Sequence, residues 1–401
     1  MEAIERLLDW ATAHGVELNG IGPKPLPGRG IGIVATRALQ VDAPPTPSRT
    51  PIPSPVSPAA IDLHRHAQAR EDILTVPSSL LRSLGTTPGP IVRKLRGATV
   101  HAILAASLCL ETSPEFDVWR AVLPSPDDLA TCMPICWPPG LQVLLPPTAT
   151  SLLAKQRAKF DGDWALVAAA YPHVRRRDFL YAWNLVNSRT FYHTTPQTER
   201  KLPKDDHMAL QPVADLFNHS PDGCSVAFDQ ADFTITTTRA HAPGDELFIR
   251  YGPHSNDFLL VEYGFTIAQG NPWDETCLDP YLCPAFAAAQ RRRLADAGFW
   301  QGYMLDAQTP CYRSQTALRM LCVTPRQWQA VLDGTRDEDQ DAGAIDAKLL
   351  EVLRRYERAI RGRIAEIDGT EAGTEDMRSS LRSRWVQIKD LVVTTIERLQ
   401  Y

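Results

Sequence analysis

The sequence has little cysteine, little net charge and no long apolar run. Eight cysteines among 401 residues are too few for a disulfide framework, which favours a reducing compartment. The 42 Lys and Arg residues against 47 Asp and Glu leave a net charge of −5, which argues against a nucleic-acid-binding protein held by a general basic surface. No apolar run approaches the length of about 20 residues that a membrane helix needs. The first twenty residues mix acidic side chains into their apolar positions, which is wrong for a secretory signal. We therefore expect a soluble cytoplasmic monomer, with a nuclear share as an alternative, that binds neither nucleic acid nor membrane.

The first part of the chain combines strand patterns with one proline-rich segment. A short amphipathic helix is predicted around residues 4–11, and residues 31–35 resemble a strand punctuated by glycine. Residues 41–60 contain seven prolines and almost no large apolar residue, so they predict a flexible, partly polyproline-like loop. Three further segments are predicted as strands: residues 72–77, 232–238 and 246–251.

The rest of the chain is expected to be largely helical. Ala- and Leu-rich patterns predict a helical insertion from about residue 92 to 178. Two amphipathic helices are predicted in the final third, separated by acidic, glycine-containing breaks near 334–343 and 368–377. The length of the chain corresponds to two or three domains. The fold class is therefore α+β, with a mostly β core, a helical insertion and a C-terminal helical region.

Two short motifs about thirty residues apart carry the chemical information. Asn218 and His219 place amide and imidazole groups in one tight turn. Tyr251 ends an apolar strand at a glycine, which predicts a hydroxyl at the end of a sheet, and Tyr263 and Phe265 add aromatic rings nearby in sequence. A narrow aromatic slot with few polar groups suits an aliphatic amine or a sulfonium better than a phosphate.

At these residues the chain resembles the SET-domain methyltransferases, and most of all the branch with the Rubisco large-subunit, ribosomal-protein and actin-histidine enzymes. Five motifs carry the resemblance and occur in the family's order: 28–35, 76–80, 183–191, 214–220 and 244–265. They cover residues 1 to about 270, which the resemblance assigns to the SET domain. Residues 271–401 correspond in position and helical character to the branch's substrate-binding region.

The resemblance implies a role for each matching residue. Arg29, Gly30 and Ile31 would offer backbone contacts to S-adenosylmethionine, Asn218 and His219 would hold its two ends, and Arg189 would lie between its carboxylate and the substrate. Tyr251 corresponds to the catalytic tyrosine at the methyl-transfer channel. Four residues correspond to positions that face the substrate: Asp215, His193, Tyr263 and Phe265. The implied activity is methylation of a lysine in a non-histone protein.

Two other functions remain open from the sequence. Histidine N-methylation belongs to the same branch, and a SET-fold protein without methyl transfer to a macromolecule would bind a partner or act on a small molecule. No metal is expected, because Cys132–Cys136 and Cys277–Cys283 lack the close spacing of a zinc site and the family's Cys-rich cluster is missing. His254 is interpreted as a surface or lining residue.

Overall fold

The computed structural model describes residues 2–40, 71–196, 198–228 and 232–400. The predicted loop 41–60 lies outside the described residues. The chain divides into two compact units: unit 1 is Met1–Pro124 with Asp163–Gly252, and unit 2 is Ser125–Gly162 with Pro253–Tyr401. This division differs from the boundary at residue 270 that the family resemblance gives, because residues 125–162 pack with the C-terminal helices.

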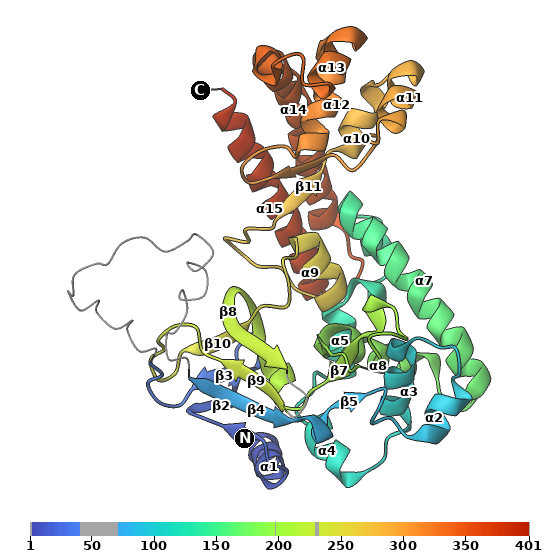
Figure 1. Ribbon diagram of the computed structural model, residues 1–401, viewed down its shortest axis with the longest axis vertical. Helices are drawn as coiled ribbons and strands as arrows, with labels where there is room; N and C mark the ends of the chain where they lie inside the picture. The colour runs from blue at the N-terminus through green and yellow to red at the C-terminus, as the bar shows by residue number, and fades with distance from the viewer. Residues whose placement is uncertain (1, 41–70, 197, 229–231, 401) are drawn as a thin grey trace, which may run out of the picture. The chain divides into compact units, whose positions relative to one another are not determined.

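Unit 1 is built on a mixed sheet and a smaller one (Figure 1). Within the described residues, the larger sheet has the order β1-β4-β9-β8-β10-β3-β2. Its strands are β1 (Glu17–Leu18), β2 (Ile21–Leu26), β3 (Gly30–Ala35), β4 (Asp72–Pro77), β8 (Asn218–Phe228), β9 (Asp232–Thr236) and β10 (Glu246–Ile249). The smaller sheet has the order β5-β7-β6, with β5 (Arg82–Ser83), β6 (Thr190–Tyr192) and β7 (Met208–Leu210).

Alternating burial explains why these segments form strands. Phe233 and Ile235 of β9 are buried while their neighbours are half-buried, and Leu247 and Ile249 of β10 follow the same period of two. The strands predicted at 31–35, 72–77 and 232–238 are confirmed by β3, β4 and β9. The strand predicted to reach Tyr251 ends at Ile249 instead.

A wide irregularity in β8 brings the Asn-His turn beside β10. These two strands run parallel, and Phe248 pairs with Asn218 whereas the next residue, Ile249, pairs with Cys224. Residues 219–223 are therefore extra residues on the β8 side. Gly223 lies so close to β10 that an added Cβ would be 2.4 Å from the Ile249 carbonyl carbon, so this crossing requires glycine.

Unit 1 also contains helices. They are α1 (Glu2–Ala13), α2 (Gly89–Lys94), α3 (Val100–Leu110), α4 (Pro114–Arg120) and α8 (Arg176–Arg189). Helix α3 packs along α8, and a hydrogen bond of 2.9 Å joins the His101 imidazole to the Trp183 carbonyl. Helix α7 (Pro147–Ala170) begins in unit 2 and ends in unit 1. The helical segment predicted to end near 178 thus continues to Arg189.

Unit 2 is mainly helical. Its helices are α5 (Pro126–Cys132), α6 (Pro139–Gln142), α9 (Asn256–Tyr263), α10 (Asp279–Leu282), α11 (Ala288–Asp296), α12 (Tyr312–Cys322), α13 (Pro325–Leu332), α14 (Ala342–Gly369) and α15 (Glu375–Arg398). A short ribbon joins β11 (Glu275–Cys277) to β12 (Met304–Asp306). Helices α14 and α15 form an antiparallel pair (Figure 1) that confirms the two amphipathic helices predicted in the final third. Its buried stripe includes Leu353, Tyr356 and Ile388.

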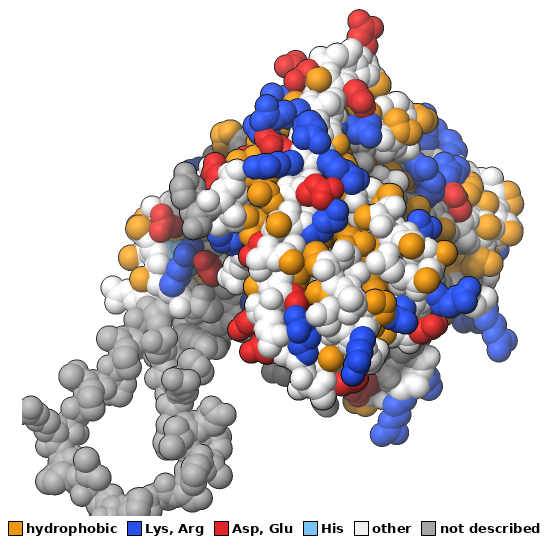
Figure 2. Space-filling model, turned by 90° about the horizontal axis from the view of Figure 1, so that it is seen from above, with side chains coloured by type: hydrophobic (Ala, Val, Ile, Leu, Met, Phe, Trp, Pro, Cys, Tyr) orange, Lys and Arg blue, Asp and Glu red, His pale blue; other side chains and the backbone are white. Residues whose placement is uncertain are grey.

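The surface carries both signs of charge. On the face drawn in Figure 2, Lys and Arg side chains are interspersed with Asp and Glu side chains and with apolar ones. In the part of the chain that the structure describes, no helix is both long enough and apolar enough to cross a membrane.

Candidate active site

Tyr251 is fixed by two hydrogen bonds in unit 1. Its hydroxyl donates to the Phe217 carbonyl oxygen at 2.7 Å, and its backbone N–H donates to His219 Nδ1 at 3.0 Å. The second bond explains why β10 stops at Ile249, since an imidazole and not a strand carbonyl accepts this N–H. Because Nδ1 is the acceptor, the neutral His219 ring carries its proton on Nε2. The two rings lie 5.0 Å apart, so the structure brings the predicted catalytic tyrosine and a predicted cofactor residue together.

Asn218 belongs to a chain of polar contacts across the sheet. Its Nδ2 donates to Glu246 Oε1 at 2.7 Å, and Glu246 Oε2 accepts from the Arg29 guanidinium at 2.6 Å. An added Cβ on Gly32 would lie 2.9 Å from both Asn218 Nδ2 and Glu246 Oε1, so the contact depends on glycine at that position. The Arg29 side chain, for which only backbone contacts were predicted, is therefore tied to Asn218 through Glu246.

The backbone of the turn between β2 and β3 is not covered by side chains at its two glycines. Gly28 and Gly30 both have φ of +71°, a region that favours glycine, and an added Cβ at either position would meet no atom within 4 Å. The Ile31 side chain is half-buried beside them. This turn thus leaves open space above backbone amides, as a ligand held by main-chain contacts requires.

Asp215 is a buried carboxylate with incomplete charge compensation. Its side chain has no exposed surface, and Trp119 Nε1 donates to Oδ2 at 3.2 Å. Arg189, the last residue of α8, gives its shorter hydrogen bond to the Asp215 backbone carbonyl (2.6 Å) and lies 3.4 Å from Oδ2. Burial raises the pKa of Asp215 to about 6, although Arg189 and Trp119 act in the opposite direction.

The backbone just before Asp215 is strained. Val213 has φ of +72° and ψ of −48°, close to the rare γ-turn that costs a β-branched residue of order 1–3 kcal/mol. The Asp215 N–H donates to the Gln211 carbonyl at 3.1 Å, a bond that spans Val213 from both sides. Strain of this kind is typical of functional sites, and here it sets the direction of the segment from Asp215 to His219.

His193 lies in a different environment within unit 1. It follows β6, its ring is 4.6 Å from the Phe228 ring, and its backbone N–H donates to the His207 carbonyl. Burial and the neighbouring His207 lower the pKa of His193. The substrate role of His193 stays a prediction.

Tyr263 and Phe265 belong to an aromatic wall in unit 2, defined as the four half-buried rings of His254, Phe258, Tyr263 and Phe265. His254 stacks on Phe258 at 4.1 Å, and the Tyr263 ring lies 6.3 Å from each of the other three. Burial, helped by nearby Glu262, raises the pKa of Tyr263 to about 12, so the phenol stays protonated at neutral pH. His254 is half-buried and forms part of this wall.

Gly264 sets the direction of the aromatic wall. It ends α9 with φ of +80°, and an added Cβ would lie 2.8 Å from Cys132 Sγ. Only glycine combines this left-handed conformation with so close an approach. The chain can therefore turn between Tyr263 and Phe265 and keep both rings on the wall.

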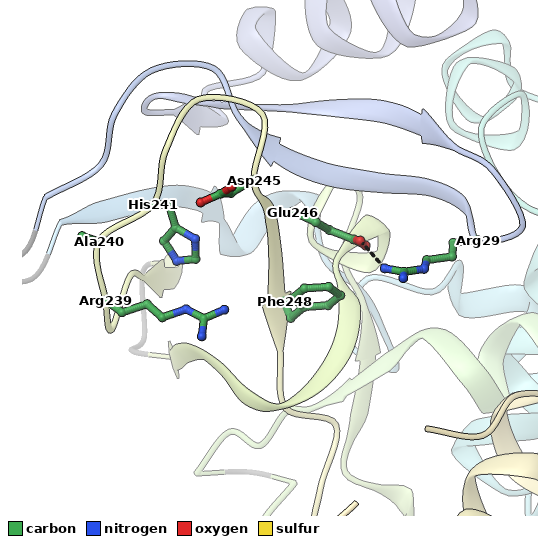
Figure 3. Close-up of a pocket in the computed structure, with 7 residues that line it drawn as sticks. All are labelled: Arg29, Arg239, Ala240, His241, Asp245, Glu246 and Phe248. Atoms are coloured by element: carbon green, nitrogen blue, oxygen red, sulfur yellow. Dashed lines mark hydrogen bonds and ion pairs between the residues drawn. The ribbon is translucent and has the colours of Figure 1, made fainter. Parts of the chain in front are cut away.

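A cavity of about 510 Å³ borders the Asn218–Glu246–Arg29 contacts. Seven residues line it: Arg29, Arg239, Ala240, His241, Asp245, Glu246 and Phe248. In Figure 3 the Arg29–Glu246 ion pair lies on one side, and the guanidinium of Arg239 points toward the Phe248 ring. Of the predicted cofactor residues only Arg29 lines this cavity. Its size is in the usual range for small-molecule sites.

No protein-family model matches the chain. Among known proteins it is 30% identical over 224 residues to ribosomal lysine N-methyltransferase set11 of Schizosaccharomyces pombe, a match that covers 53% of this chain and 57% of the relative. It is 26% identical to SET domain-containing protein 4 of Mus musculus over 350 residues, with 78% of each chain covered. The chain thus spans little more than half of the first relative and about three quarters of the second.

Solved structures show the fold. The SET domain of the Rubisco enzyme LSMT bound to lysine and AdoHcy superposes with a TM-score of 0.62 at 14% identity, over 100% of this chain and 91% of that one. Rubisco LSMT bound to AdoMet gives the same TM-score at 16% identity. The chain has a SET-domain fold. The family resemblance and the α+β fold class inferred from the sequence are confirmed.

Three contributors to this SET-domain site were missed in the sequence. Glu246 links Asn218 to Arg29, the Phe217 carbonyl holds the Tyr251 hydroxyl, and Trp119 donates to Asp215. Glu246 had a detectable signal, because an acidic side chain on the half-buried face of an otherwise apolar strand needs a partner. The other two lie far from their partners in sequence and leave no local pattern.

The structure also bears on metal binding. Across the described ranges, no three His, Cys, Asp or Glu side chains are grouped so as to hold a metal ion.

Proposed function

We propose that this protein is an S-adenosylmethionine-dependent protein-lysine N-methyltransferase that acts on a non-histone protein. The names of the relatives support the activity. The observation that carries the proposal is the arrangement around Tyr251, whose hydroxyl and amide are held by Phe217 and His219 at the end of a sheet. A phenol fixed in this way can orient an incoming amine without being a strong base.

The residues present fit the cofactor. The open, Cβ-free backbone at Gly30 can take main-chain contacts, and the polar contacts of Asn218, Glu246 and Arg29 offer both signs of charge to a zwitterionic ligand. We assign Arg29, Gly30, Ile31, Asn218, His219 and Arg189 to cofactor binding. When bound, the cofactor supplies an electrophilic methyl group on a sulfonium.

The protein's own task is to deliver a neutral amine in line with that methyl group. A free lysine has a pKa of about 10.4, so its ammonium form must lose a proton to the solvent before the nitrogen can attack. A desolvated, aromatic setting lowers that pKa because it disfavours the charged amine. The Tyr251 oxygen, which donates its proton to the Phe217 carbonyl, keeps lone pairs that can accept an N–H bond from the amine. Positioning of this kind supplies a large part of the rate.

The substrate residues are proposed by resemblance. Asp215, His193, Tyr263 and Phe265 are assigned to the target protein. For Asp215, burial against Arg189 and Trp119 supports a role in shaping the pocket more than in direct proton transfer. The half-buried aromatic wall supports the assignment of Tyr263 and Phe265, because partly exposed rings suit the aliphatic stem of a lysine.

The experiment uses methyl-labelled S-adenosylmethionine, a lysate from a host strain that lacks the enzyme, and purified histones as a second substrate. Wild type and Tyr251→Phe are compared, and labelled bands are hydrolysed to identify the modified amino acid. We expect methyl-lysine in a non-histone band with wild type and at least a 10²-fold lower rate with Tyr251→Phe, whose cofactor affinity should be unchanged.

Each other outcome contradicts a part of the proposal. Methyl-histidine in the hydrolysate would replace lysine by histidine as the target. Binding of the cofactor by calorimetry with no label in any protein would point to a small-molecule substrate or a non-catalytic role. Equal turnover by Tyr251→Phe would remove Tyr251 from the mechanism.

We also propose that the protein is a monomer in the cytoplasm, with a nuclear share as the alternative. The low cysteine content of the sequence supports a reducing compartment. Light scattering of the purified protein and imaging of a tagged chain in its host test these two statements.

A further inference from the structure

Helix α15 contacts the chain immediately after the aromatic wall. Gln387 Nε2 donates to Thr266 Oγ1 at 3.0 Å and to the Ile267 carbonyl at 3.2 Å. Thr266 and Ile267 follow Phe265 directly and are only half-buried. A residue of the last helix, more than a hundred positions away, thus holds the segment that ends the wall.

Asn256 ties the same segment to the start of α9. Its Oδ1 accepts the Ile267 N–H at 3.0 Å, and its Nδ2 donates to Gln387 Oε1 at 3.0 Å. The Asn271 amide also donates to Asn256 Oδ1 at 3.0 Å. Both ends of the stretch that bears Tyr263 and Phe265 therefore meet at one amide pair, Asn256 and Gln387.

Arg384, one turn before Gln387, anchors this arrangement. Its guanidinium is fully buried and binds Asp257 Oδ1 at 2.6 Å and Asp274 Oδ2 at 2.7 Å. It also donates to the Glu275 carbonyl at 3.0 Å. Asp257 is in the first turn of α9 and Asp274 follows the loop after the wall, so this ion triad joins α15 to both sides of the wall segment.

The two α15 residues differ in what they contribute. Removal of Arg384 leaves buried carboxylates without their partner, which threatens the fold. Gln387 is half-buried, and its hydrogen bonds to Thr266, Ile267 and Asn256 are neutral. Its contact with Arg384 is long, at 3.4 Å, so a folded protein of this size tolerates the loss of these bonds. A substitution of Gln387 should therefore change the position of the wall and leave the stability of unit 2 nearly unchanged.

We propose that Gln387, supported by Arg384, is a positioning residue that fixes the aromatic wall and through it the affinity for the substrate side chain. The inference rests on the proposed function, because it takes Tyr263 and Phe265 as substrate-facing. The C-terminal region then has a second role besides any contact with the target protein, because the hydrogen bonds of Gln387 in α15 fix the position of the wall.

The test uses Gln387→Met in the full chain, which removes the amide but keeps a side chain of similar length. We expect the KM for the protein substrate to rise about tenfold, with kcat changed less than threefold and the Kd of S-adenosylmethionine unchanged. Hydrogen exchange at the Ile267 amide should become about tenfold faster, since Asn256 loses one of its hydrogen-bond partners and the Ile267 carbonyl loses Gln387. Thr395→Val is the matched control, because it removes a buried hydroxyl on the same helix that donates to the Leu391 carbonyl, and it should change neither readout.

Hydrogen exchange distinguishes a failure of this inference from a failure of the proposed function. If the wild type methylates no protein, the proposed function fails, while the exchange rates still decide whether Gln387 holds the wall. Unchanged exchange at residues 264–271 would overturn the proposal, and so would faster exchange with an unchanged KM. Equal changes in Gln387→Met and Thr395→Val would reduce Gln387 to a general contribution to helix packing.

Discussion

Each unit contains an arginine beside a buried carboxylate, and the two arginines differ in which groups accept their short hydrogen bonds. In unit 1, Arg189 gives its short hydrogen bond to the Asp215 carbonyl and stays 3.4 Å from the carboxylate. In unit 2, Arg384 gives its short bonds to two carboxylates, at 2.6 and 2.7 Å. The first arrangement leaves an acid whose pKa is raised to about 6, whereas in the second the guanidinium contacts both carboxylates directly.

The difference shows that a buried carboxylate can either hold the backbone in place or have a pKa shifted toward neutral pH. Burial also raises the pKa of Asp257, but a guanidinium in direct contact offsets part of that effect. The triad around Arg384 is suited to fix backbone, since breaking it is costly. Asp215 beside the strained Val213 is suited to respond to its surroundings, because its protonation changes near neutral pH.

The largest effect is expected for Arg384→Met. Loss of the guanidinium leaves Asp257 and Asp274 buried without their cation, so the free energy of unfolding should fall by about 3–5 kcal/mol. Arg382→Met is the matched control on the same helix, because its ion pair with Asp368 is half exposed on both sides and should contribute at most about 1 kcal/mol. Urea unfolding followed by tryptophan fluorescence measures both. A similar loss of unfolding free energy in the two variants would contradict the special role of the buried triad.

An intermediate effect is expected for Asp215→Asn, and it depends on pH. Because the pKa of Asp215 rises from 3.8 to about 6 on folding, the folded state binds this proton more tightly than the unfolded chain. The contribution of Asp215 to stability is therefore present below about pH 4 and is lost as the pH rises to about 6, by up to about 3 kcal/mol. Asparagine keeps an acceptor for Trp119 and removes this dependence.

The measurement for Asp215 is urea unfolding of wild type and variant near pH 4.5 and near pH 7. The stability of Asp215→Asn relative to wild type should be greater at the higher pH. An identical difference at the two pH values would contradict the raised pKa of Asp215.

The smallest effect is expected for Asn218→Ala. Its amide bonds Glu246 near the surface, where Arg29 still holds the carboxylate, so little stability should be lost. The affinity for S-adenosylmethionine should fall about tenfold, or about 1.4 kcal/mol, as for one lost hydrogen bond to a charged group. Calorimetry measures this, with Glu246→Gln as a companion that keeps an acceptor for Asn218. An unchanged Kd for Asn218→Ala would contradict its assignment to the cofactor.

The sequence determined the local structure and the family resemblance. Apolar alternation located β3, β4 and β9, helical periodicity located α14 and α15, and five motifs in order indicated the SET-domain fold. These signals are readable because they repeat at the period of the element or lie within one short motif. The strand predicted to end at Tyr251 was located as well, although β10 stops at Ile249.

Only the tertiary structure decided which groups meet. Glu246 is joined to Arg29 across 217 positions, and Arg384 to Asp257 across 127, and neither separation leaves a periodic trace in the sequence. The same holds for the irregularity of β8, which places His219 Nδ1 where it accepts the hydrogen bond of the Tyr251 amide. Hydrogen bonds and ion pairs depend on ångström-scale distances between residues remote in the chain, and those distances exist only once both units have packed.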